Sequence, residues 1–423
     1  MSELTLMDVV VLLLLTASMP LLVDNYLKAG RFSAGVKFAI ILGGLLWLVF
    51  AFFAEPLSRD LLGVPMYDAW GHMLNAENLA LSMNQGSWAP FWEHFRTGNH
   101  AYQCYVVLIM WLGASVYSVQ MLNAWFCFWG GLILASRFSS VCPYATNRNL
   151  WLYVTVFLPS VVFWGTQNLK EGLMFWSICC ILSSAFPERG NAFSLRSPLV
   201  LAAIAVGGVL RPHVTMGWVI SVAAVSIFAS GRRTLAAVMF LILPLLAISL
   251  RQLTGAGLST ESFTDLAETH FANLAHIQGQ GSGIEYMSGN PIFFVSGFIS
   301  AFFRPFPWKI TSTRLLMSVI ETWALTLTLA WIWIKYGSSY GSLALRMPAV
   351  RAAILGIVWM CILLSYFPNE GLMIRQKVQM MPGLLTLVIV PFLLKEAARQ
   401  RVVFQRAFFN GSLSSAYTGP KSG

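Results

Sequence analysis

Residues 6–23 read LMDVVVLLLLTASMPLLV, an apolar run of about the length that crosses a lipid bilayer as a helix. Hydrophobic residues make up 57% of the chain and charged residues 10%, far from the roughly 25% charge of an average soluble domain. The pattern therefore predicts an all-α, polytopic integral membrane protein with about 11 transmembrane helices. The ten further runs are residues 38–54, 119–136, 150–165, 172–186, 198–210, 214–230, 235–250, 315–334, 352–367 and 384–394.

The loops between these runs sort their charges onto two sides. One set holds 17 basic residues, among them Arg148 and Arg233, but only the acidic residues Asp24, Glu188 and Glu396. The other set holds 10 basic residues, 14 acidic residues and all six histidines. Because Lys and Arg near helix ends resist translocation, the first side is expected to be cytoplasmic and the second external.

This sorting decides the place of residues 101–117, a moderately apolar segment that contains Gln103 and Gly113. If the segment crossed the membrane, every later loop would change sides and the sorting would be lost. We therefore expect an interfacial helix there, within a long external loop at residues 55–118. A second long external loop is predicted at residues 251–314.

Residues 1–394 are thus expected to form one transmembrane domain, and residues 395–423 a basic cytosolic tail that is disordered at its end. The acidic start before residue 9 lacks the basic region of a signal peptide, so we expect an uncleaved, external N-terminus. The net charge of +10 follows from the basic cytoplasmic side, so no nucleic-acid partner is expected. The six cysteines show no metal-site spacing and are interpreted as packing residues.

The first external loop carries the densest set of reactive side chains. A membrane enzyme needs a charge or a base near the headgroup plane, and a carboxylate flanked by aromatic residues fits that need. The alternative is that the Trp residues form an interfacial belt and the acids are solvated. The candidates are Tyr67, Asp68, His72, Glu93 and His94.

The remaining external turns keep cations on the side that otherwise loses positive charge. Arg offers a bidentate fork to phosphate oxygens, so these residues are candidates to bind a lipid-linked phosphate. Alternatively, each cation pairs with one of the external acids. The candidates are Lys170 with Glu171, Arg211 with His213, Arg304, and Arg375 with Lys377.

The chain resembles the polytopic GT-C-type membrane glycosyltransferases of bacterial polysaccharide biosynthesis clusters over roughly residues 37–394. The resemblance implies that Asp68 is a catalytic base and that Glu171 takes the place of a second catalytic acid. Asp68 is followed by Ala69 where that family often has paired acids, and an extra N-terminal span precedes the matching core. The features that carry it are Tyr67-Asp68, the Trp88–Tyr102 region, Leu112-Gly113, Leu122-Asn123, Leu158-Pro159, Phe163-Trp164, Lys170-Glu171, Arg211-Pro212-His213 and Arg375 with Pro382.

The expected function is transfer of a sugar or oligosaccharide from an undecaprenyl-phosphate-type lipid carrier to an acceptor, outside the bacterial inner membrane. Expected partners are the lipid-linked saccharide, membrane lipids and other polysaccharide-assembly proteins. A divalent cation, Mg²⁺ or Mn²⁺, stays open as a cofactor, with no ligands assigned. The alternatives are an O-antigen-polymerase-like enzyme and a transporter or flippase of lipid-linked saccharides, which would carry broken helices and charges near the bilayer midplane.

Overall fold

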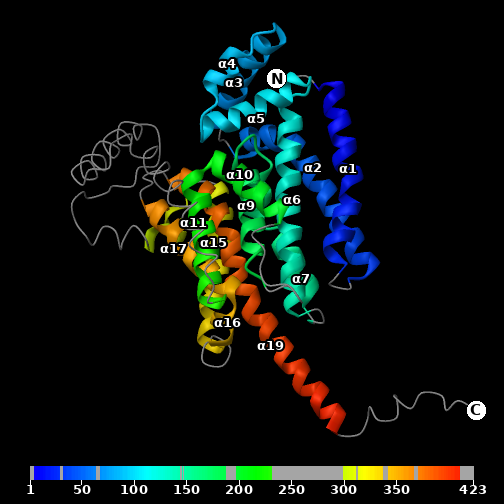
Figure 1. Cartoon of the computed structure of the whole chain (residues 1–423), viewed down its shortest axis with the longest axis vertical. Helices are drawn as coiled ribbons and strands as arrows, with labels where there is room; N and C mark the ends of the chain where they lie inside the picture. Colours follow the sequence, from blue (N-terminus) through cyan, green and yellow to red (C-terminus); the bar gives the residue numbers. More distant parts are fainter. Residues whose placement is uncertain are drawn as a thin grey trace, which may run out of the picture.

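The computed structural model describes residues 4–28, 32–62, 67–142, 145, 147–186, 197–230, 299–310, 313–336, 342–365 and 370–409. Every regular element in these ranges is a helix, and none is a strand. Most of the helices form one upright bundle, with α3, α4 and α5 at the same end as the N-terminus (Figure 1). The all-α fold predicted from the sequence is therefore confirmed for the described residues.

Three long helices, α1, α2 and α6, form one side of the bundle (Figure 1). They are α1 (Leu6–Leu27), α2 (Ala34–Leu62) and α6 (Val116–Val141). The Asp8 carboxylate accepts hydrogen bonds from the main-chain N–H and hydroxyl of Ser115 and from the hydroxyl of Ser118, at 2.6–2.9 Å. One buried carboxylate thus fixes the start of α1 against the start of α6.

The predicted span at residues 150–165 is divided into two helices, α7 (Arg148–Val156) and α8 (Pro159–Gly165). Pro159 explains the break, because proline lacks a main-chain N–H and disfavours helical backbone at the preceding residue. Leu158 is accordingly extended, with ψ of 124°. A five-residue turn then leads into α9 (Glu171–Ser183), which packs along α6.

The rest of the bundle contains short as well as long helices. Five segments are long and apolar enough to cross a membrane, and four shorter helices, α9, α10, α11 and α17, are also apolar. The predicted count of eleven is thus not reached among the described residues, and the run at 235–250 lies outside them. The further elements are α10 (Pro198–Leu210), α11 (Pro212–Ser230), η2 (Pro307–Lys309), α15 (Thr313–Tyr336), α16 (Ser342–Arg346), α17 (Pro348–Ser365), α18 (Glu370–Lys377), η4 (Val378–Met380) and α19 (Met381–Phe409).

The predicted first external loop folds into α3 (Tyr67–Asn84), α4 (Ala89–His94) and α5 (Asn99–Trp111). All three lie at one end of the bundle, where α6 begins (Figure 1). Gly113 follows α5 with φ of +86°, a left-handed conformation that favours glycine. It turns the chain from α5 into α6, so α5 lies across the end of the bundle.

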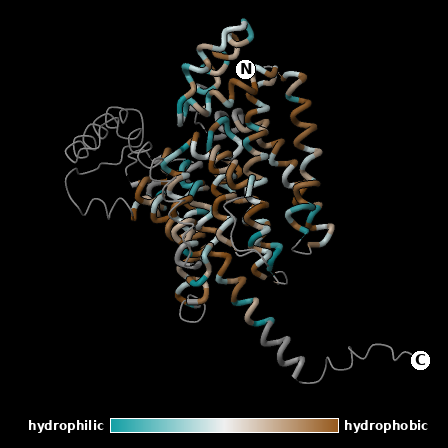
Figure 2. The backbone as a smooth tube through the Cα atoms, in the orientation of Figure 1, coloured by the Kyte–Doolittle hydropathy of each residue, from teal (hydrophilic) through white to brown (hydrophobic). Residues whose placement is uncertain are grey.

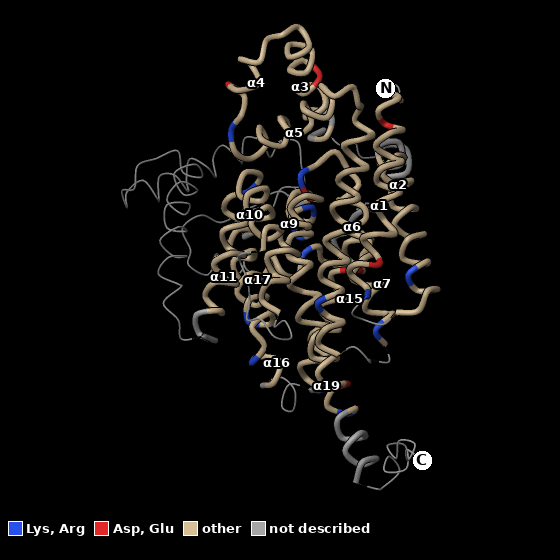
Figure 3. The backbone as a smooth tube through the Cα atoms, turned by 45° about the vertical axis from the view of Figure 1, so that its right-hand side comes forward, with Lys and Arg blue, Asp and Glu red and all other residues tan. Residues whose placement is uncertain are grey.

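The surface of the bundle suits a lipid environment. Large apolar side chains are exposed on α1 and α2, including Leu13, Leu14, Phe38 and Leu46, and hydrophobic colour runs along most of α1 (Figure 2). Charged residues are sparse along the bundle helices (Figure 3). Long apolar helices with lipid-like surfaces support the prediction of a membrane protein.

The predicted boundary at residue 394 falls inside α19, which continues to Phe409. Residues 395–401 contain Lys, Glu, Ala, Arg and Gln, all good helix formers, so the last span extends as a helix beyond its apolar part. In Figure 1 this part of α19 projects from the end of the bundle opposite α3–α5. Residues 410–423 lie outside the described part of the chain.

Candidate functional site

A buried carboxylate shared by two arginines lies at the centre of the candidate site. Glu171, the first residue of α9, is fully buried. Its Oε1 lies 2.6 Å from Nη2 of Arg211, which joins α10 to α11, and 3.0 Å from Nε of Arg375 on α18. The three residues come from separate segments of the chain, and Arg211 is itself 3% exposed. Two of the cations selected from the sequence thus meet at one point.

The turn before Glu171 is recessed from the end of the bundle. Main-chain oxygens of Gln167 and Leu169 accept hydrogen bonds from Nδ2 of Asn123, at 2.9 and 3.0 Å. Asn123 lies about two helical turns into α6, roughly 10 Å along the axis from its start. Gly172 permits this approach, since a Cβ there would lie 2.8 Å from the oxygen of Asn123. The recess follows from the length of α9, about 20 Å against a bilayer core of about 30 Å.

Helix α5 covers the recessed turn. Lys170 Nζ donates to Oδ1 of Asn99, the first residue of α5, at 2.5 Å. The main-chain N–H of Gly98 donates to the oxygen of Val209 near the end of α10, at 2.9 Å. The predicted interfacial helix is therefore bonded both to the Lys170 turn and to the segment that carries Arg211.

A buried hydrogen-bonded set joins the turn to the first external loop. The Tyr102 hydroxyl on α5 accepts from Asn123 Nδ2 at 2.8 Å and donates to Asn168 Oδ1 at 2.9 Å. Asn168 Nδ2 donates to the main-chain oxygen of Ala69 at 3.1 Å. Ala69 follows Asp68 in the first turn of α3, so the predicted base lies on backbone that is tied to the Glu171 turn.

Three histidines and a glutamine continue this polar region towards the surface. Gln103 lies between His72 and His94: its Oε1 is 2.5 Å from Nε2 of His94 and its Nε2 is 3.3 Å from Nδ1 of His72. His100 Nδ1 is 3.2 Å from the same His94 nitrogen. One side of an amide donates and the other accepts, so Gln103 holds His72 and His94 in complementary roles.

The pKa of His100 is lowered by protein atoms that crowd its ring and by the charges of His94 and Arg96. His100 is exposed and lies at the start of α5, at the surface end of this chain of contacts. Its neutral form is favoured, which suits its nitrogen to accept the proton of His94 Nε2.

The other predicted residues of the first loop divide into two groups. Tyr67 and Asp68 are the first two residues of α3, and the described part of the structure does not include their side chains. Glu93 lies exposed on α4 and forms no hydrogen bond or ion pair with any residue that the structure describes. His72 and His94 are therefore joined to the buried network, whereas Glu93 is not.

The cations of the last loops adopt different roles. Lys377 Nζ donates to the main-chain oxygens of Phe302 (2.8 Å) and Arg304, so it ties α18 to the segment at 299–310. The Arg304 guanidinium lies 5.5 Å from the centre of the Phe306 ring and not at Glu171. His213 starts α11 two residues after Arg211, and its main-chain oxygen accepts from Trp359 Nε1 at 2.9 Å.

Four uncharged residues of this cluster were not selected from the sequence as site residues. Asn123 and Gln103 interrupt apolar helices, and a polar amide inside an apolar run is a usable signal, because such residues in membrane helices are costly unless they are bonded. Asn168 and Tyr102 give no comparable signal, since a loop amide and an interfacial tyrosine are ordinary at their positions.

Metal and thiol chemistry find no assembled site in the described residues. No group of three or more His, Cys, Asp or Glu side chains there is arranged to hold a metal ion. All six cysteines are buried and free of disulfide bonds. A requirement for Mg²⁺ or Mn²⁺ therefore stays a prediction without ligands.

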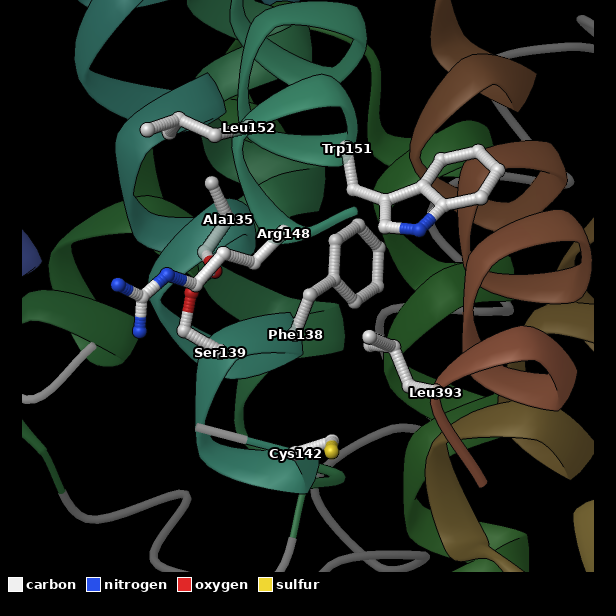
Figure 4. Close-up of a pocket in the computed structure, with 8 residues that line it drawn as sticks. All are labelled: Ala135, Phe138, Ser139, Cys142, Arg148, Trp151, Leu152 and Leu393. Atoms are coloured by element: carbon white, nitrogen blue, oxygen red, sulfur yellow. The ribbon is translucent and has the colours of Figure 1, made fainter. Parts of the chain in front are cut away.

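A small hollow lies at the opposite end of the bundle, between α6, α7 and α19 (Figure 4). Its empty volume is about 230 Å³, below the range of about 300–1,000 Å³ of small-molecule sites. Trp151 and Leu393 line one side of it, and Arg148 points away from them in Figure 4. The hollow lacks the converging charges that distinguish the Glu171 cluster.

No protein-family model matches this chain, and no curated protein or solved structure shows significant similarity to it.

Proposed function

We propose that the chain is a membrane glycosyltransferase that uses a sugar carried on a polyprenyl phosphate, with its active site at the α3–α5 end of the bundle. The proposal places the site outside the cytoplasm of a bacterial cell, on the inner membrane, as the charge sorting of the loops predicts. The lipid chain would reach the site from the bilayer, and the acceptor from the external side.

The observation that carries the proposal is the meeting of Arg211 and Arg375 at the buried Glu171 carboxylate. Guanidinium groups bind phosphate oxygens through paired N–H donors, and two of them held at one point form a receptor for a phosphate group. Lys170, adjacent to Glu171 and bonded to Asn99, adds a third cation at the same turn. The cluster is at the depth that a phosphate tethered to a polyprenyl chain can reach.

Glu171 has a geometry that favours positioning over proton transfer. Its carboxylate is fully buried, and one of its oxygens already contacts both arginines. Two neighbouring guanidinium groups stabilise the ionised carboxylate and oppose its protonation. We therefore assign Glu171 to holding Arg211 and Arg375 in place, in preference to the catalytic role that the resemblance implies.

Asp68 is proposed as the general base. Its carboxylate takes the proton from an acceptor hydroxyl as that oxygen forms a bond to the anomeric carbon of the sugar. The bond from this carbon to the phosphate oxygen breaks, and the phosphate leaves with the bonding electrons, stabilised by Arg211 and Arg375. The hydrogen bond from Asn168 to Ala69 ties the backbone beside Asp68 to the turn that carries Glu171.

Reconstituted protein tests the proposal. Purified protein in liposomes with a polyprenyl-phosphate sugar and external saccharide acceptors should release free polyprenyl phosphate and extend the acceptor. Arg375→Gln should weaken donor binding by at least about tenfold, because a hydrogen bond to a charged group contributes about 1.5–3 kcal/mol. Arg148→Gln, at the other end of the bundle, is the matched control and should bind normally. Equal binding by both variants would contradict the phosphate site.

A transporter of lipid-linked saccharides is the second candidate, and the break between α7 and α8 favours it. Broken helices near the middle of the membrane are typical of transporters. Here the start of α8 is capped by Glu321 of α15, whose carboxylate accepts from the main-chain N–H of Ser160 at 2.7 Å and from its hydroxyl. Movement of intact lipid-linked sugar across the liposome membrane without release of polyprenyl phosphate would support this candidate instead. An O-antigen-polymerase-like enzyme would differ by requiring a lipid-linked acceptor.

A further inference from the structure

Asn168 occupies an unusual position between two parts of the proposed active site. Its side chain is 1% exposed and uses both ends of its amide. The oxygen accepts from Tyr102 on α5, and the nitrogen donates to the main-chain oxygen of Ala69 on α3, 99 residues earlier in the chain. It lies in the turn that leads to Lys170 and Glu171.

The orientation of the Asn168 amide is fixed from both sides. Asn123 bonds the main-chain oxygens of the neighbours of Asn168, Gln167 and Leu169, and holds the turn. The same Asn123 amide donates to the Tyr102 hydroxyl, so this hydroxyl is left to donate to Asn168 Oδ1. The Asn168 nitrogen must then face the Ala69 oxygen, which can only accept.

The consequence is geometric coupling between the predicted base and the cation cluster. Ala69 is the third residue of α3 and follows Asp68 directly. The same turn places Glu171, and through it Arg211 and Arg375. A change of about 1 Å in the separation of reacting groups can cost about 10²-fold in rate. The single hydrogen bond from Asn168 to Ala69 lies on the shortest covalent and hydrogen-bonded path between Asp68 and Glu171 in the described residues.

We propose that Asn168 is a positioning residue that sets the separation between Asp68 and the Glu171–arginine cluster without itself contacting substrate. This inference rests on the proposed glycosyl transfer. It assigns to a neutral amide a role in turnover that is separate from donor binding, because the arginines keep their own contacts with Glu171 when the Ala69 bond is lost.

Asn168→Asp is the sharpest test, because it is isosteric. It keeps an oxygen for the Tyr102 hydroxyl but replaces the donor to Ala69 with a second acceptor, which repels that carbonyl. We expect kcat to fall by about 10²-fold while donor Kd changes less than about twofold. Ser18→Ala is the matched control, since it removes a comparable inter-helix bond, from Trp125 Nε1 at 2.9 Å, away from the site. That variant should keep native kcat.

Hydrogen–deuterium exchange separates this inference from the proposed function. In Asn168→Asp, amides at the start of α3 should exchange faster, whereas those of α9 should not. Faster exchange together with reduced kcat and native donor Kd supports the positioning role. Unchanged exchange overturns the coupling, and native kcat despite faster exchange overturns its catalytic meaning. Parallel loss of donor binding would show a general structural role. If the wild-type protein transfers no sugar, the proposed function fails and the positioning role with it, whereas the exchange result still tests the contact.

Discussion

Replacement of Glu171 by glutamine is the most demanding test of the buried cluster. Glu171 is fully buried and its Oε1 contacts Arg211 at 2.6 Å and Arg375 at 3.0 Å. Glutamine keeps the shape but removes the charge, so two guanidinium groups stay close together without the carboxylate. Removal of one partner from a buried ion pair costs about 3–5 kcal/mol. We expect a loss of this size in the free energy of unfolding.

The assay is unfolding by a denaturing detergent, followed by loss of helical signal in purified protein. A second variant, Glu171→Gln with Arg375→Gln, removes one positive charge as well and should recover part of the lost stability. The matched control is Asp24→Asn, which breaks an ion pair with Lys37 at 2.5 Å whose acid is 68% exposed. Water screens that pair, so the unfolding midpoint should stay close to native.

The reasoning would be refuted if Glu171→Gln were as mild as Asp24→Asn. The same conclusion would follow if the double variant were simply the sum of its single changes, since that result denies any interaction between Glu171 and Arg375.

Three further predictions concern topology, helix docking and pH. A cysteine introduced beside Arg148 should react with a thiol reagent only from the cytoplasm, and labelling from outside would invert the topology. Asp8→Ala should lower stability by about 1–3 kcal/mol, because Ser115 and Ser118 lose their buried acceptor; native stability would contradict this anchor. Because the pKa of His100 is lowered in the folded state, protonation favours unfolding. Its contribution is therefore present above the unfolded value of about 6.5 and is lost as pH falls towards the folded pKa. His100→Gln should remove this dependence, measured as amide exchange of α5 between pH 7 and pH 5.

The helices that the sequence predicts best are those whose hydrophobic run is long and whose ends carry caps. The starts of α1 and α6 follow from Leu6 and Val116 with their neighbouring polar residues. The break at Pro159 was not predicted, although proline gives a physical reason for it. A composition window averages over one residue, whereas a single missing N–H is enough to divide a helix.

The site was predicted in part because charges in apolar surroundings are costly and therefore informative. Arg211 and Arg375 were selected as cations on the disfavoured side, but their common partner Glu171 could not be inferred, since the two arginines are far apart in sequence. Asn168 and Tyr102 were not selected. Their importance depends on long-range contacts and not on residue type, so sequence alone assigns them no role.

The most direct test of the central claim compares Asp68→Asn with the wild-type protein in a sugar-transfer assay in lipid. General-base assistance contributes about 10²–10⁴-fold, so Asp68→Asn should lose that much turnover while donor binding and folding stay close to native. Glu77→Gln, an acid on the same helix α3, is the control and should keep most of the activity. Near-native turnover by Asp68→Asn would remove Asp68 from the mechanism and contradict the proposed glycosyl transfer by this site.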